Sequence, residues 1–328
     1  MESAGTKPTN SEFDVVVLGD CNPDLVLTGD EVEPSFGQVE RLVDEADLMI
    51  GGSGGIFAAG AARLGLRTAF VGMVGDDVFG RFMCDALGER GVDTSGIVVD
   101  PSLRTGITVI LSRPGDRAIL TFPGTIAALD AAHVDPKLLA STRHVHVASY
   151  FLQTSLVPSL PALFQRAHEA GATTSVDPNW DPHETWDGGL RGLLRSTDLF
   201  LPNAEEAIRI AGIQNAREAA LALAADGPLT AVKLGAAGAI AAARSGHVAA
   251  EIPGLAGVEP VDAVGAGDSF DAGVLSGLLN GWTIDRALAL GCACGALSTQ
   301  AMGGTSAQPT LAHALEVVES LTPAKDSG

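Results

Sequence analysis

Three small residues precede an aspartate near the C-terminal end of the chain. In the segment DAVGAGDSFDAG, Gly265, Ala266 and Gly267 stand directly before Asp268, and a helical pattern follows that we expect to begin near Ser269. Backbone N–H groups of such a turn at a helix N-terminus converge on one point and bind anions. A carboxylate beside a bound phosphate can take a proton from an attacking hydroxyl, as phosphoryl transfer requires. The residues alone also allow a plainer interpretation, in which Asp268 only caps the helix.

Two other common phosphate-binding patterns are absent. G-x-x-x-x-G-K-[ST] does not occur in the sequence, which excludes a P-loop. The first predicted strand, at 13–19, continues as LGDCNPD and not as G-x-G-x-x-G. A Rossmann dinucleotide site therefore loses its main support.

Short apolar runs alternate with helical patterns from Phe13 onward. This alternation predicts an α/β protein with a mostly parallel sheet and helices on both of its faces. The predicted strands are FDVVVLG (13–19), TAFVGMVG (68–75), RHVHVAS, ATTSVDP, TDLFLPN and TAVKLG, and the predicted helices are 55–65, 78–91, 158–170, 204–211 and 215–225.

Two segments, 24–34 and 105–124, contain strand patterns without a helix between them. The second has alternating apolar residues around RPGDR, which indicates a hairpin. We expect these segments to form a small β-stranded lid outside the main sheet, although they could instead be antiparallel edge strands of that sheet. Residues 13–321 are predicted to form a single domain, with flexible tails at 1–12 and 322–328.

Two stretches of the sequence resemble the signatures of the ribokinase-like (PfkB) carbohydrate kinase family. DAVGAGDSFDAG resembles its C-terminal signature, D-T-x-G-A-G-D, and GGSGGIFAAGAARLGLRTAFVGMVGDDVFG (51–80) resembles its N-terminal one. The resemblance implies a ribokinase-like three-layer αβα sandwich with a small β-stranded lid. It also implies an ATP-dependent kinase, a phosphotransferase with an alcohol group as acceptor, whose substrate is a neutral sugar or a sugar-like molecule.

The resemblance assigns roles at the phosphate end of the site. Asp268 matches the catalytic base, and Gly265–Gly267 match the anion hole. PNAEEA matches the N-x-x-E motif, which places Asn203 and Glu206 near Mg²⁺, with Glu206 bound through water. A helix N-terminus capped by Asn203 would explain the same two residues without a metal.

The nucleotide and a monovalent cation are assigned on the same basis. KLGAAGA resembles the strand and turn that face the nucleotide, with Lys233, Gly235 and Gly238 near it; an ordinary hairpin turn is the alternative. Asp262 and the segment 298–308 resemble the loops that hold a monovalent cation, which implies K⁺.

The resemblance places the sugar near Asp24, Gly51 and Gly52, because a carboxylate can accept two hydroxyl hydrogen bonds and glycines allow a close approach. Gln153 follows a predicted strand end and is a further candidate substrate contact. Ile56 is a candidate as well, although it stands where many sugar kinases of the family carry Asn. A nucleoside kinase of the same family, with an apolar base against Ile56, therefore stays open as an alternative, as does a non-catalytic sugar or nucleotide sensor.

Two further departures from the family pattern bear on the ligands. In VDPNWDP, Asp181 replaces an Arg common in ketodeoxygluconate-type kinases, which argues against a carboxylated or phosphorylated sugar. Ala263 replaces the common Thr, which removes a hydroxyl near the phosphates.

The composition limits the partners. A formal net charge of −20 disfavours binding to nucleic acid or to an anionic membrane. The four cysteines form no C-x-x-C pair, and the polar N-terminus resembles no signal peptide, so we expect free thiols and a cytoplasmic protein. Exposed lid strands offer edges for pairing, which predicts a homodimer.

Overall fold

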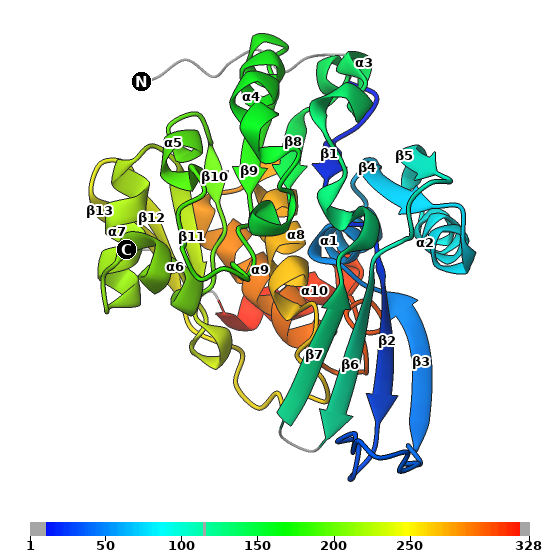
Figure 1. Cartoon of the computed structure of the whole chain (residues 1–328). Helices are drawn as coiled ribbons and strands as arrows, with labels where there is room; N and C mark the ends of the chain where they lie inside the picture. Colours follow the sequence, from blue (N-terminus) through cyan, green and yellow to red (C-terminus); the bar gives the residue numbers. More distant parts are fainter. Residues whose placement is uncertain (1–10, 114–115, 322–328) are drawn as a thin grey trace.

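A nine-stranded, mostly parallel sheet lies at the centre of the computed structural model, which describes residues 11–113 and 116–321 (Figure 1). Its strands are β1 (Val15–Leu18), β4 (Thr68–Gly75), β5 (Asp93–Asp100), β8 (His144–Val147), β9 (Thr173–Val176), β10 (Leu199–Phe200), β11 (Leu229–Lys233), β12 (Ala239–Ala243) and β13 (His247–Ile252). The strand order is β13-β12-β11-β10-β9-β8-β1-β4-β5. All neighbours from β11 to β5 pair in parallel, whereas β12 and β13 continue the sheet as antiparallel strands.

Helices cover both faces of this sheet. One face carries α1 (Ser53–Arg63), α2 (Val78–Glu89), α8 (Ala266–Leu279), α9 (Ile284–Ser298) and α10 (Leu311–Leu321). The other carries α3 (Pro136–Ala140), α4 (Leu160–Glu169), α5 (Leu190–Leu194), α6 (Ala204–Ala211) and α7 (Ala216–Ala225). Short 3₁₀ turns lie at Gly124–Ala127, Ala131–His133, Tyr150–Leu152, Val157–Ser159 and Gly235–Ala237.

Successive side chains of a strand point to opposite faces of the sheet, and this alternation produces two hydrophobic cores. In β1, Val15 and Val17 point into the core beneath α1 and α8, while Val16 and Leu18 point into the core beneath α4. The predicted three-layer αβα sandwich is therefore confirmed. Of the strands and helices predicted for the main sheet and its layers with both bounds numbered, each forms, and its ends differ from the prediction by no more than two residues.

A second sheet stands apart from the first, at the lower right of Figure 1. It consists of β2 (Pro23–Thr28), β3 (Glu45–Ile50), β6 (Ile107–Arg113) and β7 (Asp116–Phe122), in the order β3-β2-β6-β7. The separate lid sheet is confirmed, and the alternative that these strands edge the main sheet is wrong. Two details differ from the prediction: the strand in the first lid segment ends at Thr28, and β3 was not expected.

The sequence also predicted flexible tails at both ends of the chain and free thiols. Of the two tails predicted to be flexible, only residues 11 and 12 fall within the described chain. All four cysteines are free, as expected; Cys84 is partly exposed and the other three are buried. In the described part of the chain, no helix is long and apolar enough to cross a membrane.

Candidate active site

Polar residues gather where the parallel strands end. Asp20 follows β1, Asp177 follows β9, Asn203 follows β10, and Lys233 is the last residue of β11. Ligands of open α/β sheets bind at this carboxyl edge. The candidate site therefore lies between the sheet edge and the N-terminus of α8.

The glycine-rich turn forms the start of α8. The helix begins at Ala266, three residues earlier than predicted, with Gly265 as N-cap at φ 69°. A Cβ on Gly265 would lie 2.7 Å from the Gly304 Cα and 2.8 Å from the Ile56 Cγ2, so both the backbone and the space require glycine. Asp268 consequently lies within the first helical turn and does not cap the helix. N–H groups of this turn have no partner inside the helix and are available to an anion.

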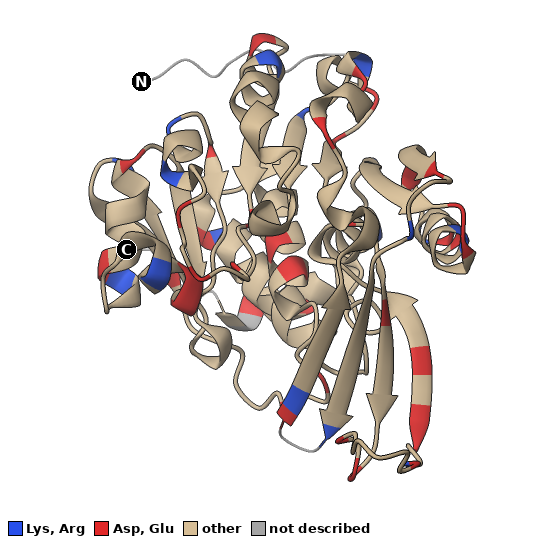
Figure 2. Ribbon diagram, in the orientation of Figure 1, with Lys and Arg blue, Asp and Glu red and all other residues tan. Residues whose placement is uncertain are grey.

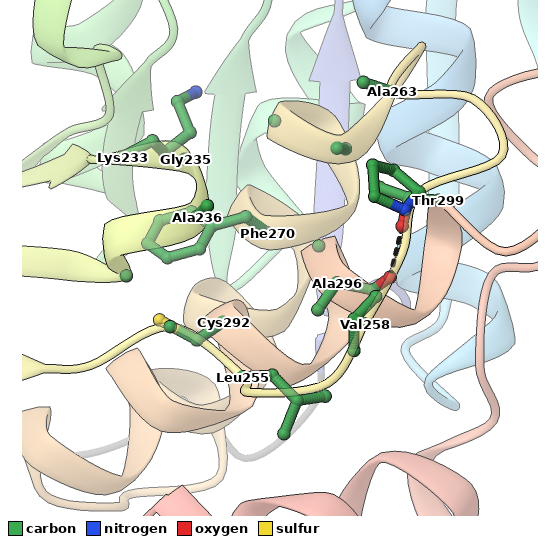
Figure 3. A pocket seen from close by; sticks show the side chains of 16 residues that line it. Lys233, Gly235, Ala236, Leu255, Val258, Ala263, Phe270, Cys292, Ala296 and Thr299 are labelled. Carbon is green, nitrogen blue, oxygen red and sulfur yellow. Dashed lines mark hydrogen bonds between the residues drawn. The ribbon is translucent and has the colours of Figure 1, made fainter.

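A cavity of about 260 Å³ lies against this turn (Figure 3). The residues that line it are Lys233, Gly235, Ala236, Gly238, Gly254, Leu255, Val258, Pro260, Ala263, Ala266, Gly267, Phe270, Cys292, Gly295, Ala296 and Thr299. Most are small or apolar, and the Thr299 hydroxyl donates to the Ala296 carbonyl at 2.7 Å. An apolar slot that opens on a helix N-terminus fits a flat nucleotide base with its phosphates at the helix end.

Asp268 is half-buried beside the cavity. Burial raises its pKa to about 8, and the negative charge of Asp177 adds to this rise. The positive charge of Lys233 and a hydrogen bond with Ser53 lower the same pKa. A carboxyl group poised near neutral pH in this way is suited to act as a general base.

Lys233 lines the cavity, as do Gly235 and Gly238, but its ammonium is held by two carboxylates, so its contact with a nucleotide stays a prediction. Its Nζ lies 2.7 Å from Asp177 Oδ2 and 3.0 Å from Asp271 Oδ2. Figure 3 shows its nitrogen turned away from Ala236 and Phe270. Asp271 was missed in the sequence, because it follows Asp268 on a helix that reads as apolar. The predicted turn at Gly235 and Gly238 does line the cavity.

Asn203 and Glu206 form a capping box at the start of α6. Asn203 Oδ1 accepts from the Glu206 N–H at 2.9 Å, and Glu206 Oε2 accepts from the Asn203 N–H at 2.8 Å. Burial, with the charge of Asp177, raises the pKa of Glu206 to about 7. The cap explains both residues without a metal, and the described residues contain no cluster of three or more metal-binding side chains. Glu206 Oε1 bonds to no described residue, which fits a contact to Mg²⁺ through water.

Asp24 lies on β2 of the lid and is only 6% exposed, so it is not a solvated loop residue. Burial raises its pKa to about 7, and the charges of Asp20 and Asp262 add to this rise. A Cβ on Gly51 would lie 2.0 Å from Asp24 Oδ1, so Gly51 leaves room for this carboxylate. Gly51 and Asp24 therefore lie side by side, and the contact of Asp24, Gly51 and Gly52 with a substrate stays a prediction.

Asp20 and Asn22, from the same LGDCNPD segment, were not singled out in the sequence. Asp20 accepts from the Ser53 and Gly54 N–H groups at 3.1 and 2.8 Å and so fixes the start of α1. Asn22 is 1% exposed, and its Oδ1 has no partner among the described residues. A Cβ on Gly52 would lie 2.9 Å from that oxygen. A buried, unpaired acceptor beside Asp24 points to a donor that arrives with a ligand.

Ile56 and Gln153 lie inside the protein. Ile56 is 3% exposed and packs against Gly265 and Gly304, beneath the start of α8. Gln153 is fully buried; in the orientation that satisfies both ends of its amide, it donates to the Ile126 carbonyl at 3.3 Å and accepts from the Asp20 N–H at 3.0 Å. Contact of either with a substrate stays a prediction, and these positions do not favour it.

Asp262 connects the lid to the loop before α8. Its carboxylate accepts from the Val264 and Gly303 N–H groups, each at 2.9 Å. The guanidinium of Arg117, on β7, lies 3.6 Å from its Oδ1. These partners already balance the charge of Asp262, so a monovalent cation there would compete with Arg117.

The fold is that of a family of small-molecule kinases. The family model of pfkB family carbohydrate kinases matches residues 12–311. The chain belongs to this family, and it is a phosphotransferase that acts on a hydroxyl group.

Two curated relatives illustrate the range of substrates that occur among similar proteins. A fructokinase from Klebsiella pneumoniae is 35% identical over 311 residues, covering 89% of this chain and 95% of the relative. A 5-dehydro-2-deoxygluconokinase from Geobacillus kaustophilus is 28% identical over 288 residues, covering 82% and 84%.

Two solved structures show the ligands of similar folds. A double mutant of a fructokinase from Vibrio cholerae O395, bound to fructose, ADP and a potassium ion, is 29% identical with a TM-score of 0.76, covering 94% of this chain and 99% of that one. An Escherichia coli chain described as a ribokinase II, in complex with ATP and Mg²⁺, is 24% identical with a TM-score of 0.82 and the same coverage.

Proposed function

We propose that this sugar kinase transfers the γ-phosphoryl group of ATP to a hydroxyl of a neutral sugar or sugar-like substrate, with Asp268 as the catalytic base. The observation that carries the proposal is the place of Asp268 in the first turn of α8, beside the cavity and the N–H groups at the start of the helix. The substrate oxygen attacks the γ-phosphorus while its proton passes to the Asp268 carboxylate. The bond from the γ-phosphorus to the bridging oxygen breaks, and ADP leaves. The N–H groups from Gly265 to Gly267 and the positive end of α8 stabilise the charge on the transferring group.

The proposed cofactors are ATP, Mg²⁺ and K⁺. ATP is proposed to bind in the cavity, and Mg²⁺ to be held by Glu206 through water, where it neutralises phosphate charge. Related structures that contain ATP with Mg²⁺, or ADP with potassium, support these assignments. Potassium at Asp262 is the less favoured part of the proposal, because Arg117 already lies 3.6 Å from this carboxylate.

The proposed sugar site is formed by Asp24 and Asn22. Both present buried acceptor oxygens, which suit the hydroxyl donors of a sugar. Asp181 accepts from the N–H groups of His183, Thr185 and Trp186 and holds its own loop, so that no cation stands there for an anionic sugar. A neutral sugar fits this arrangement better than a sugar acid.

A coupled ADP-release assay with Mg-ATP tests the proposal over neutral sugars, sugar alcohols, sugar acids and nucleosides. We expect the highest kcat/KM with a neutral sugar. Turnover confined to nucleosides would leave Asp268 as the base but replace the substrate class. No turnover, with ligands that still raise the melting temperature, would identify a sensor and contradict the proposal.

The pH profile of the reaction reports on Asp268. Its raised pKa of about 8 means that the free enzyme holds a proton on this carboxyl at neutral pH. The proton-accepting form therefore grows as the pH rises, and kcat/KM should rise roughly tenfold per pH unit below pH 8 and level off above it. Steady-state rates from pH 6 to 10 check this, and a profile that is flat from pH 6 to 8 would contradict a base with this pKa.

The outer edge of the lid is proposed to pair with a second copy of the chain. Strand β7 exposes Ile119, Leu120 and Phe122 at 53%, 61% and 51%. The opposite edge, β3, instead carries acidic residues (Figure 2), which discourage pairing. We therefore propose a homodimer through β7.

We also propose that the protein works in a reducing compartment such as the cytoplasm, since its four cysteines are free thiols.

A charge on β7 should separate the two subunits. We expect Leu120→Lys to sediment as a monomer at concentrations where the unaltered protein is a dimer, because a lysine at a paired apolar edge is poorly solvated. Asp47→Asn, on β3, is the matched control and should leave the dimer intact. A dimer that survives Leu120→Lys but is lost in Asp47→Asn would place the interface on the other edge.

A further inference from the structure

Lys233 lies at the centre of a buried ion network behind the anion-binding turn. Its ammonium contacts Asp177 Oδ2 at 2.7 Å and both oxygens of Asp271, at 3.2 and 3.0 Å. The side chains of Lys233, Asp177 and Asp271 are 10%, 6% and 1% exposed. Ion pairs so removed from water are costly to form, and removal of one partner leaves an uncompensated charge.

The network joins three elements that are far apart in the sequence. Lys233 ends β11, Asp177 follows β9, and Asp271 lies in α8 one turn after Asp268. A Cβ on Gly267 would lie 3.6 Å from Lys233 Nζ, so the lysine also packs against the first turn of α8. The position of this turn relative to the sheet edge therefore depends on Lys233.

The carboxyl groups around Lys233 outnumber its single charge. Lys233 interacts electrostatically with Asp177, Asp271 and Glu206, and it lies close enough to Asp268 to act on that group too. Asp20, after β1, adds another negative charge near Asp268. Because the Lys233 ammonium is positively charged, it allows more than one of these neighbouring carboxyl groups to be ionised at the same time.

We propose that Lys233 is a positioning residue for phosphoryl transfer, which fixes the first turn of α8 against the sheet edge and favours the carboxylate form of Asp268. The inference depends on the proposed function, since it assumes that Asp268 accepts the proton. The groups that face Asp268 are Asp177 after β9, Lys233 at the end of β11, Asp20 after β1 and the Ser53 hydroxyl from α1. Lys233 opposes the effects of burial and of Asp177 on the pKa of Asp268.

The test uses Lys233→Met and Lys233→Arg, assayed in the full chain with the best substrate of the ADP-release assay. We expect Lys233→Met to lower kcat by about 10²-fold or more and to move the acid limb of the kcat/KM profile upward by about one pH unit. The KM for the sugar should change less than about threefold, because Lys233 does not reach the lid. Lys233→Arg keeps the charge and should recover part of kcat and return the acid limb toward its original pH.

A double variant separates stability from positioning. Lys233→Met alone leaves Asp177 and Asp271 without their cation and should lower the melting temperature, whereas Lys233→Met with Asp271→Asn removes one of these two carboxyl groups and should recover part of that loss. If the inference holds, kcat stays low and the acid limb stays shifted in the double variant. Recovery of the melting temperature, kcat and the acid limb together would show that the network is structural only and would overturn the inference.

Two comparisons keep the outcomes distinct. Arg143→Met breaks another partly buried pair, 3.0 Å from Asp14 at the opposite ends of the strands, and should lower the melting temperature without moving the acid limb. Failure of the proposed function would appear differently, as no ADP release by the unaltered enzyme or as normal turnover in Asp268→Asn. If the unaltered enzyme turns over normally but the acid limb of Lys233→Met stays in place, the inference about Lys233 is contradicted while the proposed function stands.

Discussion

Replacement of Asp268 by Asn is expected to lower kcat by about 10²–10⁴-fold, the usual contribution of a general base. Asn has nearly the same shape as Asp, but it cannot take the proton of the attacking hydroxyl. The N–H groups of the α8 turn are unchanged, so ATP and the sugar should still bind. ATP should bind about as tightly as before at neutral pH, where Asp268 is mostly protonated, and more tightly above pH 8, where the substitution removes a negative charge near its phosphates.

The thermal stability of Asp268→Asn gives a second prediction that does not depend on its activity. The pKa of Asp268 is raised in the folded protein, so its ionisation destabilises the fold increasingly as the pH climbs from the unfolded value toward 8. Asp268→Asn removes this effect and should melt at a higher temperature than the unaltered protein at pH 8 and above. ADP-release assays measure kcat, calorimetric titration measures the binding of ATP and of the sugar, and thermal melting measures the melting temperature.

Asp285→Asn is the matched control for Asp268→Asn. Asp285 also lies in the first turn of a helix, α9, but it is exposed and does not line the cavity. Its replacement should leave kcat unchanged. Near-normal turnover in Asp268→Asn would end the proposed mechanism.

Loss of the Asp24 carboxylate is expected to raise the KM for the sugar by about 10²-fold, with a smaller effect on kcat. Asp24 is buried and can accept two hydroxyl hydrogen bonds, and a hydrogen bond to a charged group contributes about 1.5–3 kcal/mol. Asp24→Ala tests this contribution directly. The KM for ATP should stay within about threefold, because the nucleotide cavity lies at the other end of the site.

Gly51→Ala tests the same carboxylate by displacing it, whereas Asp24→Ala removes it. The added Cβ would lie 2.0 Å from Asp24 Oδ1, so the carboxylate must move and the KM for the sugar should rise as in Asp24→Ala. Gly88→Ala, in α2, has no atom within 4 Å of the added Cβ and is the matched control. A KM for the sugar that is unchanged in both Asp24→Ala and Gly51→Ala would exclude this side of the lid as the sugar site.

The sequence could predict most of the fold because apolar periodicity follows the buried faces of the elements. β3 escaped detection because its first three residues, Glu45, Ala46 and Asp47, are exposed and two of them are acidic. The start of α8 was placed too late because Gly265 and Gly267 read as loop residues. In the structure, Gly265 takes the left-handed N-cap conformation and Gly267 already belongs to the helix.

The candidate site was less predictable where it depends on packing between distant segments. Asp268 lies in the first turn of α8 and Asp24 lies on β2 of the lid, while their roles in the reaction stay predictions. For Lys233 the sequence indicated only a place near the nucleotide, since nothing in its neighbourhood in the sequence reveals that Asp177 and Asp271 surround it. Gln153 likewise follows a strand end, yet its amide is buried between Ile126 and Asp20, which only the tertiary fold brings together.

A crystal structure with ADP, Mg²⁺, aluminium fluoride and the best sugar substrate would test the central claim most directly. The account predicts that one sugar hydroxyl oxygen lies about 2.6–3.2 Å from an Asp268 carboxylate oxygen, in line with the fluoride group. The fluorides should accept from the N–H groups at the start of α8. A reacting hydroxyl placed against Asp24 or Glu206, with Asp268 still paired to Ser53, would contradict the assignment of Asp268 as the base.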